Sequence, residues 1–376
     1  MAEQGFLLIA DISGYTMFLT QSELEHAQGI LDALLKSVLA EVKAPLTLSN
    51  LQGDAVLAHL PAAKLPQAQY PLDAIERVYC SFSDTLQAMQ RNTTCTCNAC
   101  RNMKVLDLKF LLHYGAYALQ NIAGRTELQG PEVIRLHRLL KNSVTKSTGI
   151  RAYALVTQAA ADAIALPDFF ARAVSHVEHT DDFGDTAAYV YDLAPIFARW
   201  RASRRVVVTR DEPLCFESME LDLAVPPPVA WGYFNDVEKR NLWQRDGIDN
   251  VTMSSLAGGR MAQGSIQHCA HGKSETIHDI VDWRPFDYVT FHIRLPMGAV
   301  VRQMAEFTPL PNGGTHLSVR AALAESDKPL AQFGARMMTK LIAGKLLKQQ
   351  RGWQAALSKL VADDVAAGKA GVATAA

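Results

Sequence analysis

The stretch that decides the fold of the first half of the chain is GFLLIADISGYT, residues 5–16. Gly5–Ala10 is a short and continuously apolar run, which is typical of a buried β-strand. Asp11 follows at once, and Ser13–Thr16 is rich in the small and hydrogen-bonding residues that form turns. Residues 22–42 then carry apolar side chains at helical spacing. The pattern predicts a strand that ends in a carboxylate, a tight turn and a helix.

A second aspartate lies in the next turn of the chain. Two short strands, Leu46–Leu51 and Ala55–Leu60, are joined through Gly53 and Asp54, which is typical of a β-hairpin. Two carboxylates that neighbouring strands bring together form a site for hard cations such as Mg²⁺. The alternative is that Asp11 and Asp54 only cap their turns.

The rest of the first half alternates helices and strands. Val105–Tyr117 changes from an alternating to a fully apolar pattern, which indicates a central strand. Pro131–Asn142 begins with proline, as many helices do, and carries an apolar stripe. We expect further elements at 72–89 (helix), 151–156 (strand), 158–164 (helix) and 187–191 (strand).

Four motifs of this half resemble the class III nucleotidyl cyclases. Phe6–Leu19 (FLLIADISGYTMFL) is similar to the family's first strand and turn, and Gln52–His59 (QGDAVLAH) to its Gly-Asp hairpin. Phe110–Gly115 (FLLHYG) and Gly130–Leu140 (GPEVIRLHRLL) resemble a later strand and the helix at the dimer site. More narrowly, the chain resembles an uncharacterised bacterial branch of that superfamily, a domain of unknown function. The resemblance implies an α+β fold, with a ferredoxin-like palm of βαββαβ order.

The same resemblance implies a site for a nucleoside triphosphate, ATP or GTP, with Mg²⁺ or Mn²⁺. Asp11 and Asp54 would hold the cations, and Arg138 would stabilise charge on the transferring phosphate. In the family a second subunit completes each site, so a homodimer is implied. The residues expected to bind the nucleotide are Ile12, Ser13, Gly14, Tyr15, Thr16, Gly53 and the purine-recognising acid Glu127.

Two departures from the family alter ribose and base recognition. Ile134 stands where the helix normally carries an asparagine, four residues before the arginine, and an apolar side chain cannot replace its hydrogen bonds. Asn50 stands where the family carries a purine-recognising lysine. We therefore expect a divergent regulatory domain that binds divalent metal and NTP. One alternative is an active cyclase that makes cyclic nucleotide and pyrophosphate, and another is a non-catalytic dimeric scaffold.

Three cysteines, Cys95, Cys97 and Cys100, fall within six residues. Thiolates this close can converge on one borderline ion, and Zn²⁺ takes four ligands in structural sites. Cys80, His113 or a residue of a partner subunit could supply the fourth. A reactive or redox-active thiol cluster and an inert loop are the alternatives.

The second half predicts many strands in series followed by one long helix. Strand-like runs occur at 218–224, 250–254, 264–269, 275–283, 288–295, 301–307 and 315–323, and an amphipathic helix at Pro329–Leu360. Residues 215–363 resemble the START-like and polyketide-cyclase-like (SRPBCC) superfamily in element order. Glu217–Trp243, Asp282–Phe286 and Gly313–Thr315 carry the resemblance. It implies a helix-grip fold, an antiparallel sheet around the C-terminal helix, with an apolar cavity for a hydrophobic small molecule or lipid.

The composition narrows the class of protein. Lys and Arg number 37 against 38 Asp and Glu, so the chain lacks the basic excess typical of a nucleic-acid binder. No apolar run approaches the roughly 18 residues of a membrane span, and the first residues lack the features of a secretory signal. We expect a cytoplasmic protein with no nucleic-acid partner and no membrane span. The expected domains are 1–199, with a Cys-rich loop at 94–102, a linker at 200–214, a second domain at 215–363 and a disordered tail at 364–376.

Overall fold

The computed structural model describes residues 2–93, 95–122, 125–203, 205–212, 215–245, 248–271, 274–294, 300–323 and 329–370. The chain divides into two compact units, Met1–Ser203 and Arg204–Ala376. No helix within the described ranges is both long and apolar enough to cross a membrane.

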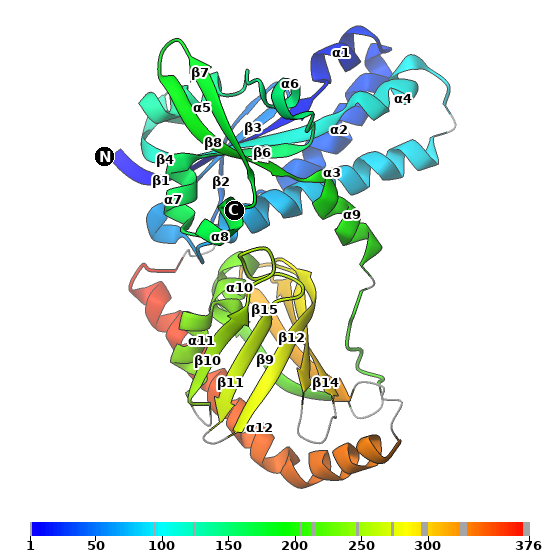
Figure 1. Ribbon diagram of the computed structural model, residues 1–376, viewed down its shortest axis with the longest axis vertical. Coiled ribbons are helices and arrows are strands. Elements are labelled where there is room, and N and C mark those ends of the chain that lie inside the picture. Colours follow the sequence, from blue (N-terminus) through cyan, green and yellow to red (C-terminus); the bar gives the residue numbers. More distant parts are fainter. Residues whose placement is uncertain are drawn as a thin grey trace. The chain divides into compact units, whose positions relative to one another are not determined.

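An eight-stranded sheet organises the first unit (Figure 1). Its strand order is β2-β3-β1-β4-β6-β8-β7, and β5 pairs with β4. The predicted first strand is β1 (Ala2–Ser13), which lies antiparallel between β3 (Ala55–Pro61) and β4 (Asp107–Ile122). Gln52 pairs with Ala55, so Gly53 and Asp54 form the predicted two-residue turn. The other strands are β2 (Thr47–Gln52), β5 (Arg125–Gln129), β6 (Tyr153–Thr157), β7 (Val174–Thr180) and β8 (Gly184–Asp192).

Helices cover this sheet. Successive side chains of a strand point to opposite faces. The odd-numbered positions of β1 and β4 pack against Val133, Leu136 and Leu139, which come from α5 and the residue after it. Asp11 and Lys109 are odd-numbered too, and therefore face the side of the sheet that α5 covers. The helices are α1 (Tyr15–Thr20), α2 (Leu24–Glu41), α3 (Tyr70–Asn92), α4 (Asn98–Asn102), α5 (Pro131–Arg138), α6 (Val144–Thr148), α7 (Gln158–Ile164), α8 (Pro167–Phe170) and α9 (Ala194–Ala202).

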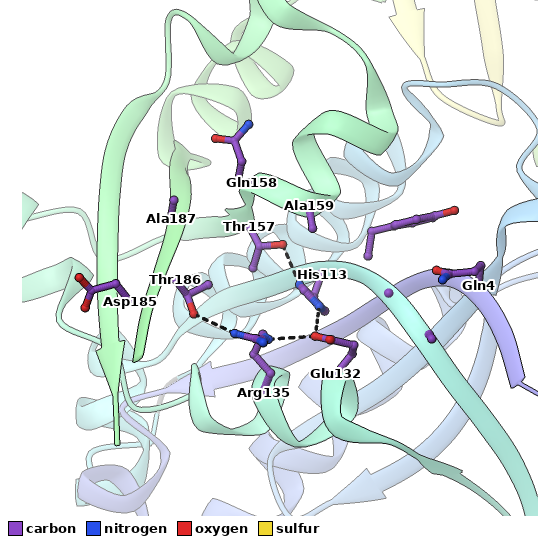
Figure 2. Close-up of a pocket in the computed structure, with 13 residues that line it drawn as sticks. Gln4, His113, Glu132, Arg135, Thr157, Gln158, Ala159, Asp185, Thr186 and Ala187 are labelled. Atoms are coloured by element: carbon purple, nitrogen blue, oxygen red, sulfur yellow. Dashed lines mark hydrogen bonds and ion pairs between the residues drawn. The ribbon is translucent and has the colours of Figure 1, made fainter. Parts of the chain in front are cut away.

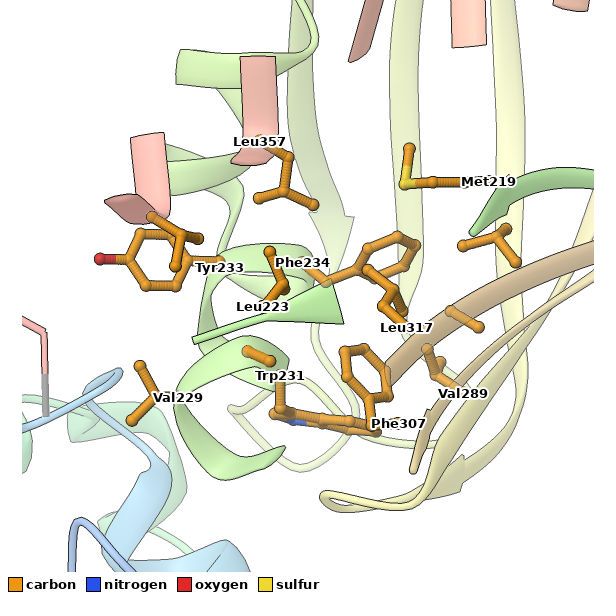
Figure 3. Packing of buried hydrophobic residues seen from close by; sticks show 14 of the residues in the cluster. Met219, Leu223, Val229, Trp231, Tyr233, Phe234, Val289, Phe307, Leu317 and Leu357 are labelled. Atoms are coloured by element: carbon orange, nitrogen blue, oxygen red, sulfur yellow. The ribbon is translucent and has the colours of Figure 1, made fainter. Parts of the chain in front are cut away.

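The second unit is a seven-stranded antiparallel sheet in the order β10-β11-β12-β13-β14-β15-β9, accompanied by three helices. Figure 3 shows its core, in which Trp231, Phe234 and Phe307 pack together and Leu357 is contributed by the last helix. The elements are β9 (Phe216–Leu223), α10 (Pro227–Asn235), α11 (Val237–Trp243), β10 (Asn250–Ser255), β11 (Ile266–His271), β12 (Ser274–Arg284), β13 (Tyr288–Arg294), β14 (Val300–Pro309), β15 (Thr315–Leu323) and α12 (Pro329–Ala366).

The bounds differ from expectation at both edges of the second domain. Helix α9 runs to Ala202, inside the expected linker at 200–214. Val208, also in that stretch, is buried beside Tyr288 and Met304, so this part of the linker packs on the second sheet. Helix α12 extends to Ala366, past the expected domain end at 363, because Val365 still packs against the apolar core.

Candidate functional site

The structure brings Asp11 and Asp54 to one corner of the first sheet. Asp11 pairs with Ala55, the residue that follows Asp54. The Ile12 backbone N–H donates to the Asp54 carbonyl oxygen at 3.3 Å. Burial raises the pKa of Asp54, and the negative charge of Asp11 raises it further. The Asp11 carboxylate is therefore close enough to Asp54 to affect the ionisation of Asp54.

Lys109 also reaches this corner, although it is not one of the predicted site residues. It pairs with Asp11 across β1 and β4, and its Nζ lies 3.1 Å from Asp11 Oδ2. The same ammonium donates to the Leu140 carbonyl oxygen at 3.1 Å. The Lys109 and Asp11 side chains are only 18% and 17% exposed, so water screens the pair incompletely. A divalent ion that binds Asp11 must share the carboxylate with this ammonium or displace it.

The turn after β1 has a backbone that only glycine fits well. Gly14 has φ of 83°, in the left-handed region, and a Cβ built there would lie 2.5 Å from the Val105 carbonyl oxygen. Helix α1 begins at the next residue, and the buried Phe18 donates its N–H to the Gly14 carbonyl oxygen at 2.9 Å. The path of Ile12–Thr16 is thus fixed beside the two carboxylates.

Two other predicted site residues, Arg138 and Glu127, form no ion pair with the aspartates within one chain. Arg138 ends α5 and is 59% exposed, and its Nε lies 2.6 Å from Asp182 Oδ2. Glu127 pairs with Gln120, which is eleven residues along β4 from Lys109. At about 3.3 Å per strand residue, Glu127 is on the order of 30 Å from the aspartates. One chain therefore assembles the carboxylates and the turn, but not the predicted purine contact.

The three cysteines of the predicted loop converge with a histidine from α2. The side-chain ligand atoms of His26, Cys95, Cys97 and Cys100 all lie within 4.8 Å of one another. Neither Cys80 nor His113 belongs to this group. Cys80 is buried. His113 is engaged in a different network, with Thr157 and Glu132.

That network lines a cavity of about 570 Å³ (Figure 2). His113 lies 2.8 Å from both Thr157 Oγ1 and Glu132 Oε2, and Arg135 Nε donates to the same Glu132 oxygen at 2.9 Å. Burial lowers the pKa of His113, so the ring is neutral and its Nε2–H donates to the carboxylate. Thr157 is 2% exposed and accepts the N–H of Ala160 at the start of α7. The network therefore anchors α5 and α7 to β4.

The comparisons with known proteins give partial matches. Residues 31–148 match a family described as protein of unknown function DUF2652. The uncharacterized protein Rv2561/Rv2562 of Mycobacterium tuberculosis is 28% identical over 162 residues, which cover 43% of this chain and 72% of that protein.

Solved structures similar to this chain include adenylyl and guanylyl cyclases, over about half of its length. The guanylyl cyclase Cya2 is 11% identical, with a TM-score of 0.40, and the match covers 50% of this chain and 92% of that one. The protein Ara h 8.0201 is 16% identical, with a TM-score of 0.29, and the match covers 40% of this chain and 97% of that one.

Proposed function

We propose that the first unit binds a nucleoside triphosphate, ATP or GTP, through Mg²⁺ or Mn²⁺, and acts as a regulatory domain. The observation that carries this proposal is the meeting of Asp11 and Asp54 beside the Gly14 turn. The negative charge of Asp11 raises the pKa of Asp54, and a hard cation held by both carboxylates is favourable because it removes their repulsion. The cation held by the carboxylates also coordinates the triphosphate, so it bridges the protein and the nucleotide.

Each group at this corner has a defined task. Asp11 and Asp54 supply oxygen ligands to the cation. The backbone N–H groups of the turn would bind phosphate oxygens, and glycine at position 14 lets the turn pass close to the Val105 carbonyl oxygen. Lys109 neutralises Asp11 before the cation arrives. Its flexible four-carbon stem lets the ammonium move to a phosphate oxygen afterwards.

Three features favour binding over cyclisation. The Arg138 guanidinium is paired with Asp182, and it has to leave this partner before it can stabilise charge on a phosphate. Ile134, one turn earlier on α5, is 53% exposed and offers no hydrogen bond to a ribose. Asn50 carries no positive charge with which it could recognise a purine. Efficient cyclase activity is the alternative, and product analysis distinguishes the two.

A second copy of the chain would complete the site. Glu127 is too distant from Asp11 to contact the same nucleotide within one chain, so any such contact has to come from another subunit. A nucleotide contact by Glu127 would therefore require a homodimer. Mixing Asp11→Asn chains with Glu127→Gln chains tests it, because mixed dimers keep one intact site and recover nucleotide binding. Failure to recover any binding would leave Glu127 outside the site.

The deciding experiment uses the full chain with each NTP, with and without Mg²⁺ or Mn²⁺. We expect equilibrium dialysis to show metal-dependent binding of ATP or GTP, and chromatography to show no cyclic nucleotide. Asp11→Asn and Asp54→Asn should each lose the metal-dependent part, whereas the control Asp185→Asn, an exposed aspartate of β8, should not. Metal-independent binding, or no binding, would contradict the proposal. Cyclic nucleotide that disappears in Asp11→Asn would establish the cyclase alternative.

For the second unit we propose an amphipathic carboxylic acid as the hydrophobic ligand. Arg240 is 2% exposed, yet its Nε and Nη1 donate to the neutral amide oxygens of Gln244 and Gln267 at 2.6 and 2.8 Å. Phe234 and Phe291 lie against the guanidinium. Among the described residues no carboxylate pairs with it. A buried cation without an anion is costly, so a ligand carboxylate would be stabilised there.

Matched probes test this ligand class. Dodecanoate should raise the melting temperature of the full chain, whereas dodecanol, which has the same tail without the charge, should not. Arg240→Met should remove the effect, and Arg245→Met, which changes an exposed arginine two residues beyond α11, should preserve it. Equal shifts with both probes would contradict a carboxylate site. If the second unit regulates the first, bound dodecanoate should also change nucleotide affinity.

A further inference from the structure

We propose that His26, Cys95, Cys97 and Cys100 form a structural Zn²⁺ site. The proposal does not depend on nucleotide binding, since none of these side chains belongs to the aspartate corner. Three thiols and one imidazole are a complete ligand set for tetrahedral zinc, and a site with four protein ligands leaves no position for a substrate. His26 is the fourth ligand, and it lies 69 residues before Cys95 in the chain.

The distances fit this geometry. Tetrahedral zinc has Zn–S bonds of about 2.3 Å and Zn–N bonds of about 2.0 Å, so ligand atoms stand roughly 3.5 Å (S to N) and 3.8 Å (S to S) apart. His26 Nδ1 lies 3.2 Å from Cys97 Sγ and 3.7 Å from Cys95 Sγ. All four ligand atoms are within 4.8 Å of one another. Small side-chain rotations bring them to one ion.

The protein holds the ligands in place without the ion. Glu23 accepts the backbone N–H groups of Asn98 and Ala99 at 3.2 and 3.0 Å, which fixes the turn between Cys97 and Cys100. Glu23 directly precedes α2 and His26 lies in its first turn, and both side chains contact the cysteine loop. One therefore binds the loop backbone while the other reaches its thiols.

A redox or inert role explains less of this arrangement. A disulfide would join two of the sulfurs, and it would not explain why the third thiol and the His26 imidazole lie beside them. All three cysteines are free. Helix α4 has five residues, too few to be stable alone. A metal that joins α4 to α2 supplies the missing constraint. Helix α4 and the residues after it also contact the turn after β1 and helix α1. Asn102 donates to the Gln21 carbonyl oxygen at 3.1 Å, and Val105 packs on Gly14.

The first test is the zinc content of the purified full chain, measured by mass spectrometry of the metal. We expect about one zinc per chain, retained through dialysis against a weak chelator. Cys97→Ser should lose it, and His26→Ala should weaken zinc binding at least tenfold. The controls Cys215→Ser, a cysteine outside the cluster, and His179→Ala, an exposed histidine of β7, should keep full occupancy. Full occupancy in Cys97→Ser would overturn the site.

A second measurement does not depend on a variant that folds. Co²⁺ added to the metal-free wild-type chain should give the intense visible bands of tetrahedral coordination and the ultraviolet charge-transfer band of cobalt–thiolate bonds. Zinc should abolish both bands at one equivalent. Weak octahedral bands only, or a thiol titration unchanged by zinc, would show that the cysteines do not bind metal together.

Discussion

The two groups of candidate metal ligands in the first unit differ in the side chains that lie beside them. Asp11 and Asp54 carry charge, and Lys109 neutralises part of it at 3.1 Å. The three thiols of the second group converge with the His26 imidazole, and their ligand atoms all lie within 4.8 Å of one another. A carboxylate site that is already paired with a lysine ammonium suits a cation that binds and dissociates together with a ligand. A site in which four protein ligands converge suits an ion that stays bound.

The largest expected effect is the loss of stability when zinc is removed. A ligand present at a thousand times its Kd stabilises the folded state by about 4 kcal/mol. Strong chelator should therefore lower the melting temperature of the first unit by roughly 10 °C. The same chelator should have no further effect on Cys97→Ser. An equal drop in both proteins would mean that the chelator acts elsewhere.

Next in size is the effect of Asp54→Asn on nucleotide binding. With Mg²⁺ present, Kd for the preferred NTP should rise at least tenfold, because one cation ligand and its charge are gone. Without Mg²⁺ the wild type and the variant should bind equally weakly. Asp54→Asn should leave zinc content unchanged, which separates the two metal sites. A variant that binds Mg²⁺–NTP as the wild type does would remove Asp54 from the site.

The sequence was informative where the signal is local. Asp11 and Asp54 stand next to apolar strands, and the hairpin turn is two residues long, so both could be located from neighbours in the chain. Lys109 could not, because its place opposite Asp11 depends on the antiparallel register of β1 and β4. Its polar character within an apolar strand was the available signal.

The sequence pattern did not predict His26 as a ligand, or β5 and β7 as strands, for related reasons. His26 meets Cys95 across 69 residues, and nothing in the amphipathic pattern of α2 marks it as a ligand. Strand β7 exposes Val174 and Val177, so its apolar residues do not trace a buried face. Strand β5 is a short polar partner of β4, and tertiary pairing rather than propensity makes it a strand.

A moderate effect is expected for Lys109→Met. The substitution keeps most of the apolar stem but removes the ammonium from Asp11, so Mg²⁺ alone should bind several-fold more tightly. Affinity for the Mg²⁺–nucleotide complex should rise less, or fall, because a phosphate partner is also lost. Calorimetric titrations with Mg²⁺ alone and then with NTP measure both. Unchanged Mg²⁺ affinity would show that Lys109 does not compete for the carboxylate.

The smallest effect concerns the pH dependence of stability at His113. Its folded-state pKa is lowered by burial, so protonation favours the unfolded chain. The stability that the neutral ring contributes is present above the unfolded pKa of about 6.5 and is lost as pH falls below it. Denaturant titrations between pH 8 and pH 5 should show a shallower slope for His113→Gln than for the wild type. The control Leu136→Ala should lower stability by a similar amount at every pH; parallel pH profiles for wild type and His113→Gln would contradict the assignment.

The most direct test of the nucleotide proposal is electron paramagnetic resonance of Mn²⁺ bound to the full chain with ATP or GTP. We predict that the protein immobilises Mn²⁺ in the presence of nucleotide, and that Asp11→Asn and Asp54→Asn return the spectrum to that of Mn²⁺–nucleotide in solution. A spectrum that is the same with the wild type and with both variants would contradict the account.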